Sequence, residues 1–156
     1  MSPSPELLER IRPPIRWFLL FAVLLVAGIA AQRGLGGGFA PSAVEAHYLG
    51  PDGAEPLPAL ALWEEFHVNA FVYGFLLLML GSILAVAPLP ARWREGLLWA
   101  GCAAALADLG APFAVVAAHG LGFLRVASFA ALAAALLASI AVAWSTLGRP
   151  ARRAHA

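Results

Sequence analysis

Residues 121–147 read LGFLRVASFAALAAALLASIAVAWSTL, and this stretch decides the fold. Arg125 is the only charged residue in it. A helix needs about 20 mostly apolar residues to cross the hydrocarbon core of a bilayer, which is about 30 Å thick. The stretch is therefore predicted to be a transmembrane helix.

Three further stretches meet the same criterion, at about residues 15–31, 60–87 and 95–118. The first follows several arginines, as the core of a signal peptide does, but Gln32-Arg33-Gly34 makes a poor cleavage site. We expect it to be retained as an anchor. The sequence thus predicts an all-α integral membrane protein, a four-helix bundle that forms a single membrane domain over residues 1–156.

The composition excludes most other classes of protein. Of 156 residues, 62% are hydrophobic and 12% are charged, whereas a soluble domain has roughly 25% charged residues. A soluble globular enzyme is therefore excluded. The net charge of +1 gives no reason to expect a nucleic-acid partner. Cys102 is the only cysteine, so an intrachain disulfide and a cysteine metal cluster are also excluded.

The arginines predict the orientation. All the basic residues except Arg33 and Arg125 lie on one side of the predicted spans: Arg10, Arg12, Arg16, Arg92, Arg94, Arg149, Arg152 and Arg153. The positive-inside rule places that side in the cytoplasm. We expect a bacterial inner-membrane protein with both termini cytoplasmic, and with the 32–59 loop and the turn at Gly120 in the periplasm.

The 32–59 loop contains a predicted short helix. Gly34 to Gly38 is expected to be a flexible hinge. Ser42 and Glu45 have the spacing of a capping box, in which each satisfies a backbone N–H of the first helical turn. Gly50-Pro51 is a strong stop signal. We expect this helix to lie over the outer end of the bundle.

Polar residues within the spans are the candidate functional residues. An ionisable residue inside a bilayer costs about 2.5–3.5 kcal/mol on insertion scales, so each one needs an explanation. All except Asp108 are expected in the outer third of the membrane: Glu64, Glu65, His67, Asn69, Asp108, His119 and Arg125.

One face of the second span carries a histidine above two glycines. Its residues follow at spacings of three and four: His67, Phe71, Gly74, Leu78 and Gly81. Gly74 and Gly81 on a bundle-facing stripe permit a close helix crossing or a flat ligand. Glu64 lies on the same side and could orient the imidazole of His67, whereas Glu65 is expected to point elsewhere.

His67 and His119 lie at the same predicted depth on different helices, so they are candidate axial ligands of a b-type haem or another metal. The alternative is that His67 is an interfacial histidine in contact with water. Arg125 is either an interfacial anchor or the partner of Glu64, a haem propionate or Asp108.

Asp108 has its own pair of alternatives. Pro112 lies one turn further along and removes a backbone hydrogen bond, which frees a carbonyl at membrane depth. We expect Asp108 to be neutral and to satisfy such freed backbone groups, with Arg125 reaching water instead. The other interpretation is a buried ion pair of Asp108 with Arg125.

Two resemblances add to this interpretation. His67-Val68-Asn69, Gly74, Leu78, Gly81 and Pro88 resemble the second helix of haem-copper oxidase superfamily proteins, and of nitric oxide reductase catalytic subunits in particular. In those subunits the histidine of a His-x-Asn motif is an axial ligand of a b-type haem. The resemblance covers this one helix, so it implies a haem ligand and no catalysis.

The second resemblance covers most of the chain. The four-helix plan, Tyr48-Leu49-Gly50 and Asp108-Leu109-Gly110-Ala111-Pro112 are similar to a family of small, largely uncharacterised bacterial membrane proteins. That family typically has a Tyr-Tyr-x-Gly motif and a His-x-His pair. Here His47 replaces the first tyrosine, and Asn69 stands where the second histidine would be.

Two functions of different classes follow. The first is a small redox subunit that binds haem b or interacts with quinol near the periplasmic face, through His67, His119, Arg125, Gly74 and Gly81. The second is a non-catalytic structural subunit or assembly factor of a larger membrane complex or a homo-oligomer. In neither case is the chain expected to be an enzyme on its own.

Overall fold

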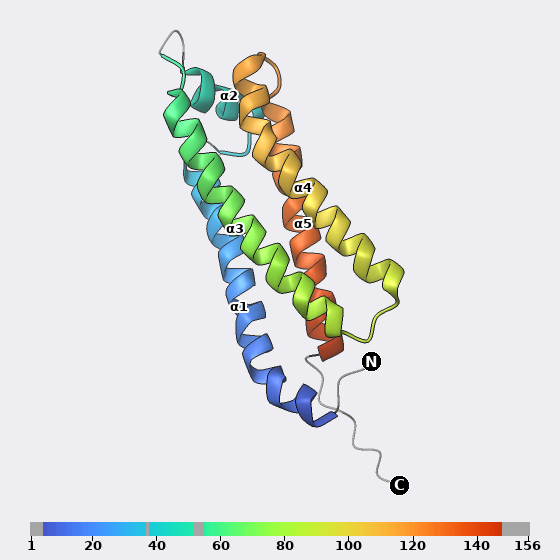
Figure 1. The fold of residues 1–156 in the computed structure, drawn as a ribbon. Coiled ribbons are helices and arrows are strands. Elements are labelled where there is room, and N and C mark those ends of the chain that lie inside the picture. Colours follow the sequence, from blue (N-terminus) through green and yellow to red (C-terminus); the bar gives the residue numbers. More distant parts are fainter. Residues whose placement is uncertain (1–4, 37, 52–54, 148–156) are drawn as a thin grey trace.

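The computed structural model describes residues 5–36, 38–51 and 55–147, and helices make up most of them. Four helices are long: α1 (Pro5–Gly36), α3 (Ala59–Val86), α4 (Ala91–Ala117) and α5 (Gly122–Leu147). They run alternately up and down, and the short α2 (Pro41–Leu49) lies across one end of the bundle beside the α4–α5 turn (Figure 1). We name this the α2 end. The all-α four-helix bundle is thereby confirmed, and no strand occurs in the described ranges.

All four long helices are long and apolar enough to cross a membrane, over Glu9–Gly36, Ala59–Val86, Ala91–Ala117 and Gly122–Thr146. This confirms the four predicted spans. The chain is therefore a membrane protein whose helices contact the lipid bilayer. The arginines expected after the last span, Arg149, Arg152 and Arg153, lie outside the described residues.

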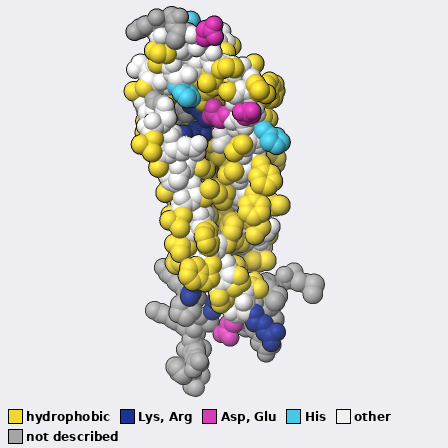
Figure 2. All heavy atoms as spheres, turned by 90° about the vertical axis from the view of Figure 1, so that its left-hand side faces the viewer, with side chains coloured by type: hydrophobic (Ala, Val, Ile, Leu, Met, Phe, Trp, Pro, Cys, Tyr) yellow, Lys and Arg dark blue, Asp and Glu magenta, His cyan; other side chains and the backbone are white. Residues whose placement is uncertain are grey.

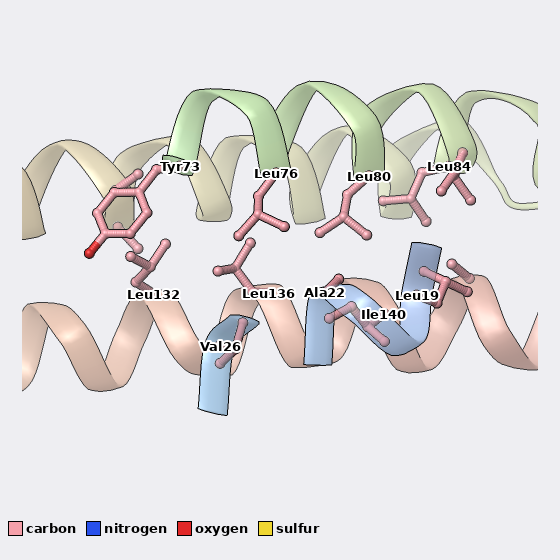
Figure 3. Close-up of a cluster of buried hydrophobic side chains, with 14 of the residues drawn as sticks. Leu19, Ala22, Val26, Tyr73, Leu76, Leu80, Leu84, Leu132, Leu136 and Ile140 are labelled. Carbon is pink, nitrogen blue, oxygen red and sulfur yellow. The ribbon is translucent and has the colours of Figure 1, made fainter. Parts of the chain in front are cut away.

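The core is formed where α1, α3 and α5 face one another (Figure 3). Their buried side chains recur every three or four residues, which places them on one face of each helix. The members include Leu19, Ala22 and Val26 on α1, Tyr73, Leu76, Leu80 and Leu84 on α3, and Leu132, Leu136 and Ile140 on α5, and α4 adds Ala104 and Ala105. The α3 residues among these are at most 1% exposed, so this face of α3 is the buried one.

Small residues allow α4 to approach its neighbours closely. Its buried residues are Gly101, Ala104, Ala105, Asp108, Ala111, Pro112 and Val115. A Cβ atom at Gly101 would lie 2.8 Å from a methyl carbon of Leu77 on α3. Lipid tails are as apolar as the helix surfaces, so the hydrophobic effect does not drive membrane helices together. Their association depends on close van der Waals packing, which small residues allow.

The lateral surface is apolar and rich in exposed aromatic side chains, as expected of a surface in contact with lipid. Trp17, Trp63, Trp93, Trp99 and Trp144 are all between 47% and 76% exposed. Trp63, Trp93 and Trp144 lie near the ends of the helices that carry them, where tryptophan side chains favour the interface between lipid and water, whereas Trp17 and Trp99 lie further inside α1 and α4.

α1 is longer than predicted at both ends. It begins at Pro5 and continues through Gly34 to Gly36, so much of the expected hinge is helical. The chain leaves the helix only near Gly38, which has a positive φ of 73°. The additional helical residues at this end include Arg33, and they place its side chain within reach of Asp108 and Tyr73 inside the bundle.

The predicted capping box of α2 is wrong. The helix begins at Pro41 after Ala40, without a side-chain cap. The carboxylate of Glu45 instead accepts a hydrogen bond of 2.9 Å from the backbone N–H of Gly122, which is the first residue of α5. The predicted stop at Gly50 is confirmed, and Val44 and Tyr48 are buried against the bundle as expected.

Candidate functional site

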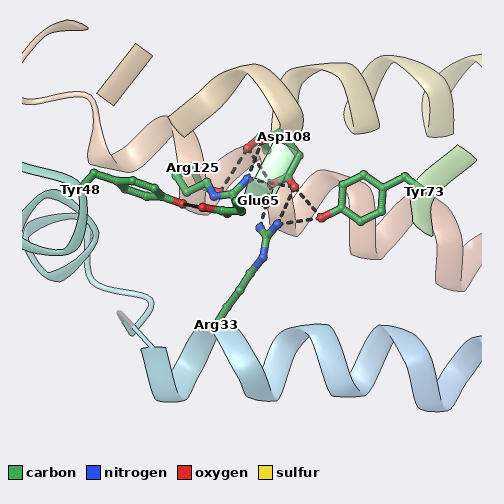
Figure 4. A network of polar contacts seen from close by, with 7 residues as sticks. Arg33, Tyr48, Glu65, Tyr73, Asp108 and Arg125 are labelled. Atoms are coloured by element: carbon green, nitrogen blue, oxygen red, sulfur yellow. Dashed lines mark hydrogen bonds and ion pairs between the residues drawn. The ribbon is translucent and has the colours of Figure 1, made fainter. Parts of the chain in front are cut away.

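Asp108 lies at the centre of a polar network near the α2 end (Figure 4). Its side chain is fully buried. Arg33 donates to both carboxylate oxygens, at 2.8 and 2.7 Å. Tyr73 donates to Oδ2 at 2.8 Å and Ser128 to Oδ1 at 3.2 Å. Both oxygens therefore have two or more partners, and Asp108 has little capacity left to bind anything else.

Arg125 makes a second ion pair with Asp108, at 3.1 Å. The same guanidinium also donates a 2.5 Å hydrogen bond to the backbone carbonyl of Asp108. In a regular helix that carbonyl would accept from residue 112, but Pro112 has no N–H. The freed carbonyl is thus satisfied by Arg125. The expectation of a neutral, unpaired Asp108 and an Arg125 that reaches water is wrong.

Through Glu65, Tyr48 extends the network to α2. Arg125 forms an ion pair with Glu65, and the hydroxyl of Tyr48 on α2 donates to both oxygens of that carboxylate, at 3.0 and 2.9 Å. Burial raises the pKa of the Tyr48 phenol to about 12; the nearby Arg125 opposes this shift and Glu65 adds to it. All five helices contribute a side chain to the network.

The network is electrically balanced. Arg33 and Arg125 carry two positive charges, and Asp108 and Glu65 carry two negative ones. An isolated charge at this depth would be expensive, and a buried ion pair is tolerated only when its remaining hydrogen-bonding groups are satisfied. Tyr73 and Ser128 supply these additional partners for Asp108.

A pocket of about 440 Å³ lies beside the network, between α1, α2, α3 and α5. Its apolar lining comes from Ile29, Phe39, Val44, Val68, Val126 and Phe129. Its polar lining comes from Gln32, Arg33, His47, Tyr48, Glu64, Glu65, Asn69 and Arg125. Figure 2 looks onto this side of the bundle, where an arginine is visible in a hollow between a histidine and acidic side chains. The surface below the hollow is predominantly hydrophobic.

The polar side chains around the pocket differ in how many of their hydrogen-bonding positions are already used within the protein. The side chains of Arg33 and Arg125 are 15% and 7% exposed and donate to carboxylates inside the network. Glu65 is 28% exposed, and its Oε2 accepts only from Tyr48. Within the described part of the chain, Glu64 and Asn69 have no hydrogen-bond or ion-pair partner. The uncommitted side chains therefore include the carboxylate of Glu64, which when ionised can only accept, and the amide of Asn69, which can donate as well as accept.

The predicted face of the second span points outward. His67 and Gly74 are exposed, and Phe71 and Leu78 are 74% and 68% exposed. Gly81 alone meets another helix, since a Cβ there would lie 3.1 Å from Leu98. The expectation that this face looks into the bundle is wrong, because the buried stripe of α3 is the one that contains Tyr73.

His119 is also exposed, in the turn that follows α4. The helix ends at Ala117, so His119 lies beyond the helix that carries Asp108. His67 and His119 are both absent from the lining of the 440 Å³ pocket, where His47 is the only imidazole. His67 instead lines a second hollow of about 510 Å³ on α3, together with Leu60, Trp63 and Phe66. Among the described residues, no cluster of three or more histidine, cysteine or carboxylate side chains could hold a metal ion.

The two glutamates of α3 exchange their predicted roles. Glu65, expected to point away, is the one that pairs with Arg125. Glu64, expected to orient His67 or to pair with Arg125, is exposed at the pocket. Asn69 lines the same pocket.

Sequence reasoning missed Arg33, Tyr48, Tyr73 and Ser128 as members of the site. One signal was available on the second span. Glu65, Asn69 and Tyr73 are spaced by four residues and continue into Leu76 and Leu80, so a polar end and an apolar core share one face. For Arg33 no such periodicity exists, because its partner lies 75 residues away.

Residues 38–154 match the model of a family described as a transmembrane helical domain. This supports the resemblance to small transmembrane helical proteins, and nothing found supports the resemblance to haem-copper oxidases. No curated protein and no solved structure matches the chain.

Proposed function

The chain belongs to this transmembrane helical family, and from that premise we propose that it is a small membrane redox subunit that binds a quinol. The pocket at the α2 end is the proposed binding site. Following the arginine asymmetry, we place this end at the periplasmic face of a bacterial inner membrane, with both termini in the cytoplasm.

The observation that carries the proposal is a pocket of small-molecule size with an amphipathic lining. Its volume of about 440 Å³ falls in the range of about 300–1,000 Å³ that is typical of ligand sites. Arg33, Tyr48 and Glu65 line it beside apolar side chains such as Ile29 and Val68. A quinol combines the same two characters, since its ring carries two polar oxygens and its tail is apolar.

The charges at the base of the pocket favour a neutral headgroup. Arg33 and Arg125 already hold Asp108 and Glu65, so neither arginine is available to neutralise an anion. An anionic headgroup would have to displace one of these carboxylates and leave it buried without a partner. Removing one partner of a buried pair typically costs about 3–5 kcal/mol.

The shape of the pocket favours a flat ring. Phe39 and Phe129, both in its lining, stack with their ring centroids 6.2 Å apart and their planes 14° apart. Arg33 lies over the Phe129 ring, 4.3 Å from its centroid. Gly36 and Gly38 add no side chain to the lining. An aromatic headgroup can stack on such a surface with ring centroids 4.5–7 Å apart.

The alternative of a b-type haem is less well supported by this geometry. The pocket offers one imidazole, that of His47, while the histidines predicted as axial ligands are exposed outside it. The two arginines that could hold propionates are held by carboxylates of the chain. We therefore favour the quinol over the haem.

Equilibrium binding of ubiquinol-1 to the purified protein in mild detergent tests the proposal. Ala61→Trp places a large side chain in the pocket lining and is expected to abolish binding. Leu78→Trp is the matched control, because Leu78 is 68% exposed on the same helix and outside the pocket. Absence of binding to the native protein, or equal binding by both variants, would instead favour the non-catalytic structural subunit.

A further inference from the structure

We infer that the pocket selects the reduced, hydroxyl-bearing form of its ligand over the oxidised carbonyl form, and that Glu65 is the residue that determines this selection. The inference rests on the proposed function and goes further, since it names the redox state that binds. It follows from which groups around the pocket remain free to make hydrogen bonds.

The charged donors and the Tyr48 hydroxyl near the pocket are largely occupied, whereas the side-chain amides of Gln32 and Asn69 can both donate and accept and so can serve either redox form. Arg33 directs three hydrogen bonds into the network, two to Asp108 and one to the hydroxyl of Tyr73. Arg125 is occupied by the Asp108 carbonyl, the Asp108 carboxylate and Glu65. The hydroxyl hydrogen of Tyr48 is directed at Glu65. A carbonyl oxygen placed beside Glu65 would have to compete for the occupied donors.

The acceptors are free. A carboxylate has about four lone-pair sites, and Glu65 uses its sites for Arg125 and Tyr48 only. Its Oε2 has a single partner, and the side chain is 28% exposed where it lines the pocket. Glu64 adds a second carboxylate that has no partner among the described residues.

A quinol supplies the donors that these acceptors lack, because each ring hydroxyl can donate to a carboxylate. Hydrogen bonds to charged groups are the stronger ones. A quinone has only acceptor oxygens, so beside a carboxylate it would place two acceptors together. The same argument applies to the dimethyl ether of the quinol, which keeps the ring but has lost both donors.

The test is to measure the affinities of ubiquinol-1, ubiquinone-1 and the quinol dimethyl ether for the native protein under anaerobic conditions. We expect the quinol to bind about tenfold or more tightly than either of the others, which corresponds to about 1.4 kcal/mol or more. In Glu65→Gln the ratio is expected to fall towards one, because an amide donates as well as accepts.

Glu64→Gln is the matched control, since it removes the neighbouring carboxylate but leaves the pair of Glu65 with Arg125 intact. It is expected to retain most of the native ratio, because Glu64 is exposed and water competes for its carboxylate, whereas Glu65 is partly buried. If Glu65 has a purely structural role, Glu65→Gln would weaken the binding of all three ligands to the same extent. The ratio of quinol to quinone affinity would then stay unchanged, which overturns the inference. Equal native affinities for quinol and quinone also overturn it but leave quinone binding intact, whereas no binding of any probe overturns the proposed function itself.

Discussion

Arg125 donates a hydrogen bond to the backbone carbonyl of Asp108 across 2.5 Å, at the one position in α4 where Pro112 removes the helical donor. A proline within a membrane helix requires a polar group from elsewhere to satisfy the freed carbonyl. Here that group is a guanidinium, which in turn requires anions. The carboxylates of Asp108 and Glu65 meet this requirement. One proline is therefore linked physically to an ion network that joins all five helices.

Asp108 and Arg33 are expected to be energetically coupled. Asp108→Asn leaves two buried arginines with one carboxylate fewer, and should destabilise the protein by about 3–5 kcal/mol. Arg33→Gln should recover part of this loss when it is combined with Asp108→Asn. Unfolding in detergent of both single variants and the double variant measures the coupling energy, which we expect to exceed about 1 kcal/mol. Additive effects would show that the two side chains act separately. Glu95→Gln, at an exposed position on α4 far from the network in sequence, is a control that should have little effect.

Tyr73→Phe should destabilise the protein without changing its packing. The hydroxyl donates to Asp108 and accepts from Arg33, and the residue is 1% exposed. Loss of a hydrogen bond to a charged group costs about 1.5–3 kcal/mol. Thermal unfolding in detergent checks this, with Tyr48→Phe as a comparison at the edge of the network. A Tyr73→Phe variant as stable as the native protein would contradict the assigned contacts.

Gly122→Ala should detach α2 from the bundle. A Cβ at this position would lie 2.2 Å from the carbonyl oxygen of Pro41, so one of the two backbones must move. That movement also breaks the hydrogen bond from Gly122 to Glu45. Faster proteolysis or hydrogen exchange in residues 41–49 is the expected result. Gly110→Ala is the control, since a Cβ there has no neighbour within 4 Å.

Tyr48 gives the protein a pH dependence at high pH. Its pKa is about 12 in the folded protein, against about 10 for a free phenol. The folded state thus holds this proton more tightly, so its contribution to stability is complete below pH 10 and falls as the pH rises from 10 to 12. A titration of phenolate absorbance, subtracted from that of Tyr48→Phe, should give a midpoint near 12. A midpoint near 10 would show that Tyr48 is not buried.

The proposed orientation can be tested independently of the ligand. A reporter that is active only in the cytoplasm, fused after Ala156, should be active, because the arginines at the opposite end from α2 favour the cytoplasmic side. A reporter that is active only in the periplasm should be silent at the same position. The reverse pattern would place the pocket on the cytoplasmic side.

The helices were predictable because each depends on local composition. The apolar run around Leu132 and Leu136 is long enough to predict a transmembrane helix and nothing else. The orientation of α3 was not predictable in the same way. Its polar residues at Glu64, Glu65, His67 and Asn69 cover more than one face, and a lipid-facing stripe is as apolar as a buried one. The sequence therefore favours the stripe that contains His67, whereas the buried stripe is the one that leads from Glu65 to Tyr73.

The ion network could be predicted only in part. Asp108, Arg125 and Pro112 were identified as related, but the charge state of Asp108 depends on how many cations reach it. Arg125 alone could have been satisfied at the membrane surface. Arg33 makes the difference, since it brings a second cation across 75 residues of sequence. No local pattern indicates that α1 continues to Gly36 and so delivers it.

Photolabelling tests the central claim, that the pocket at the α2 end is a quinol site, most directly. The native protein is illuminated with an azido-substituted short-chain benzoquinol, and the modified peptides are identified by mass spectrometry. The account predicts labels on pocket-lining segments of α1, α3 and α5, around Arg33, Val68 and Phe129, that are lost in Ala61→Trp and displaced by excess ubiquinol-1. Labels confined to the outward stripe around Phe71 and Leu78, unaffected by ubiquinol-1, would contradict it.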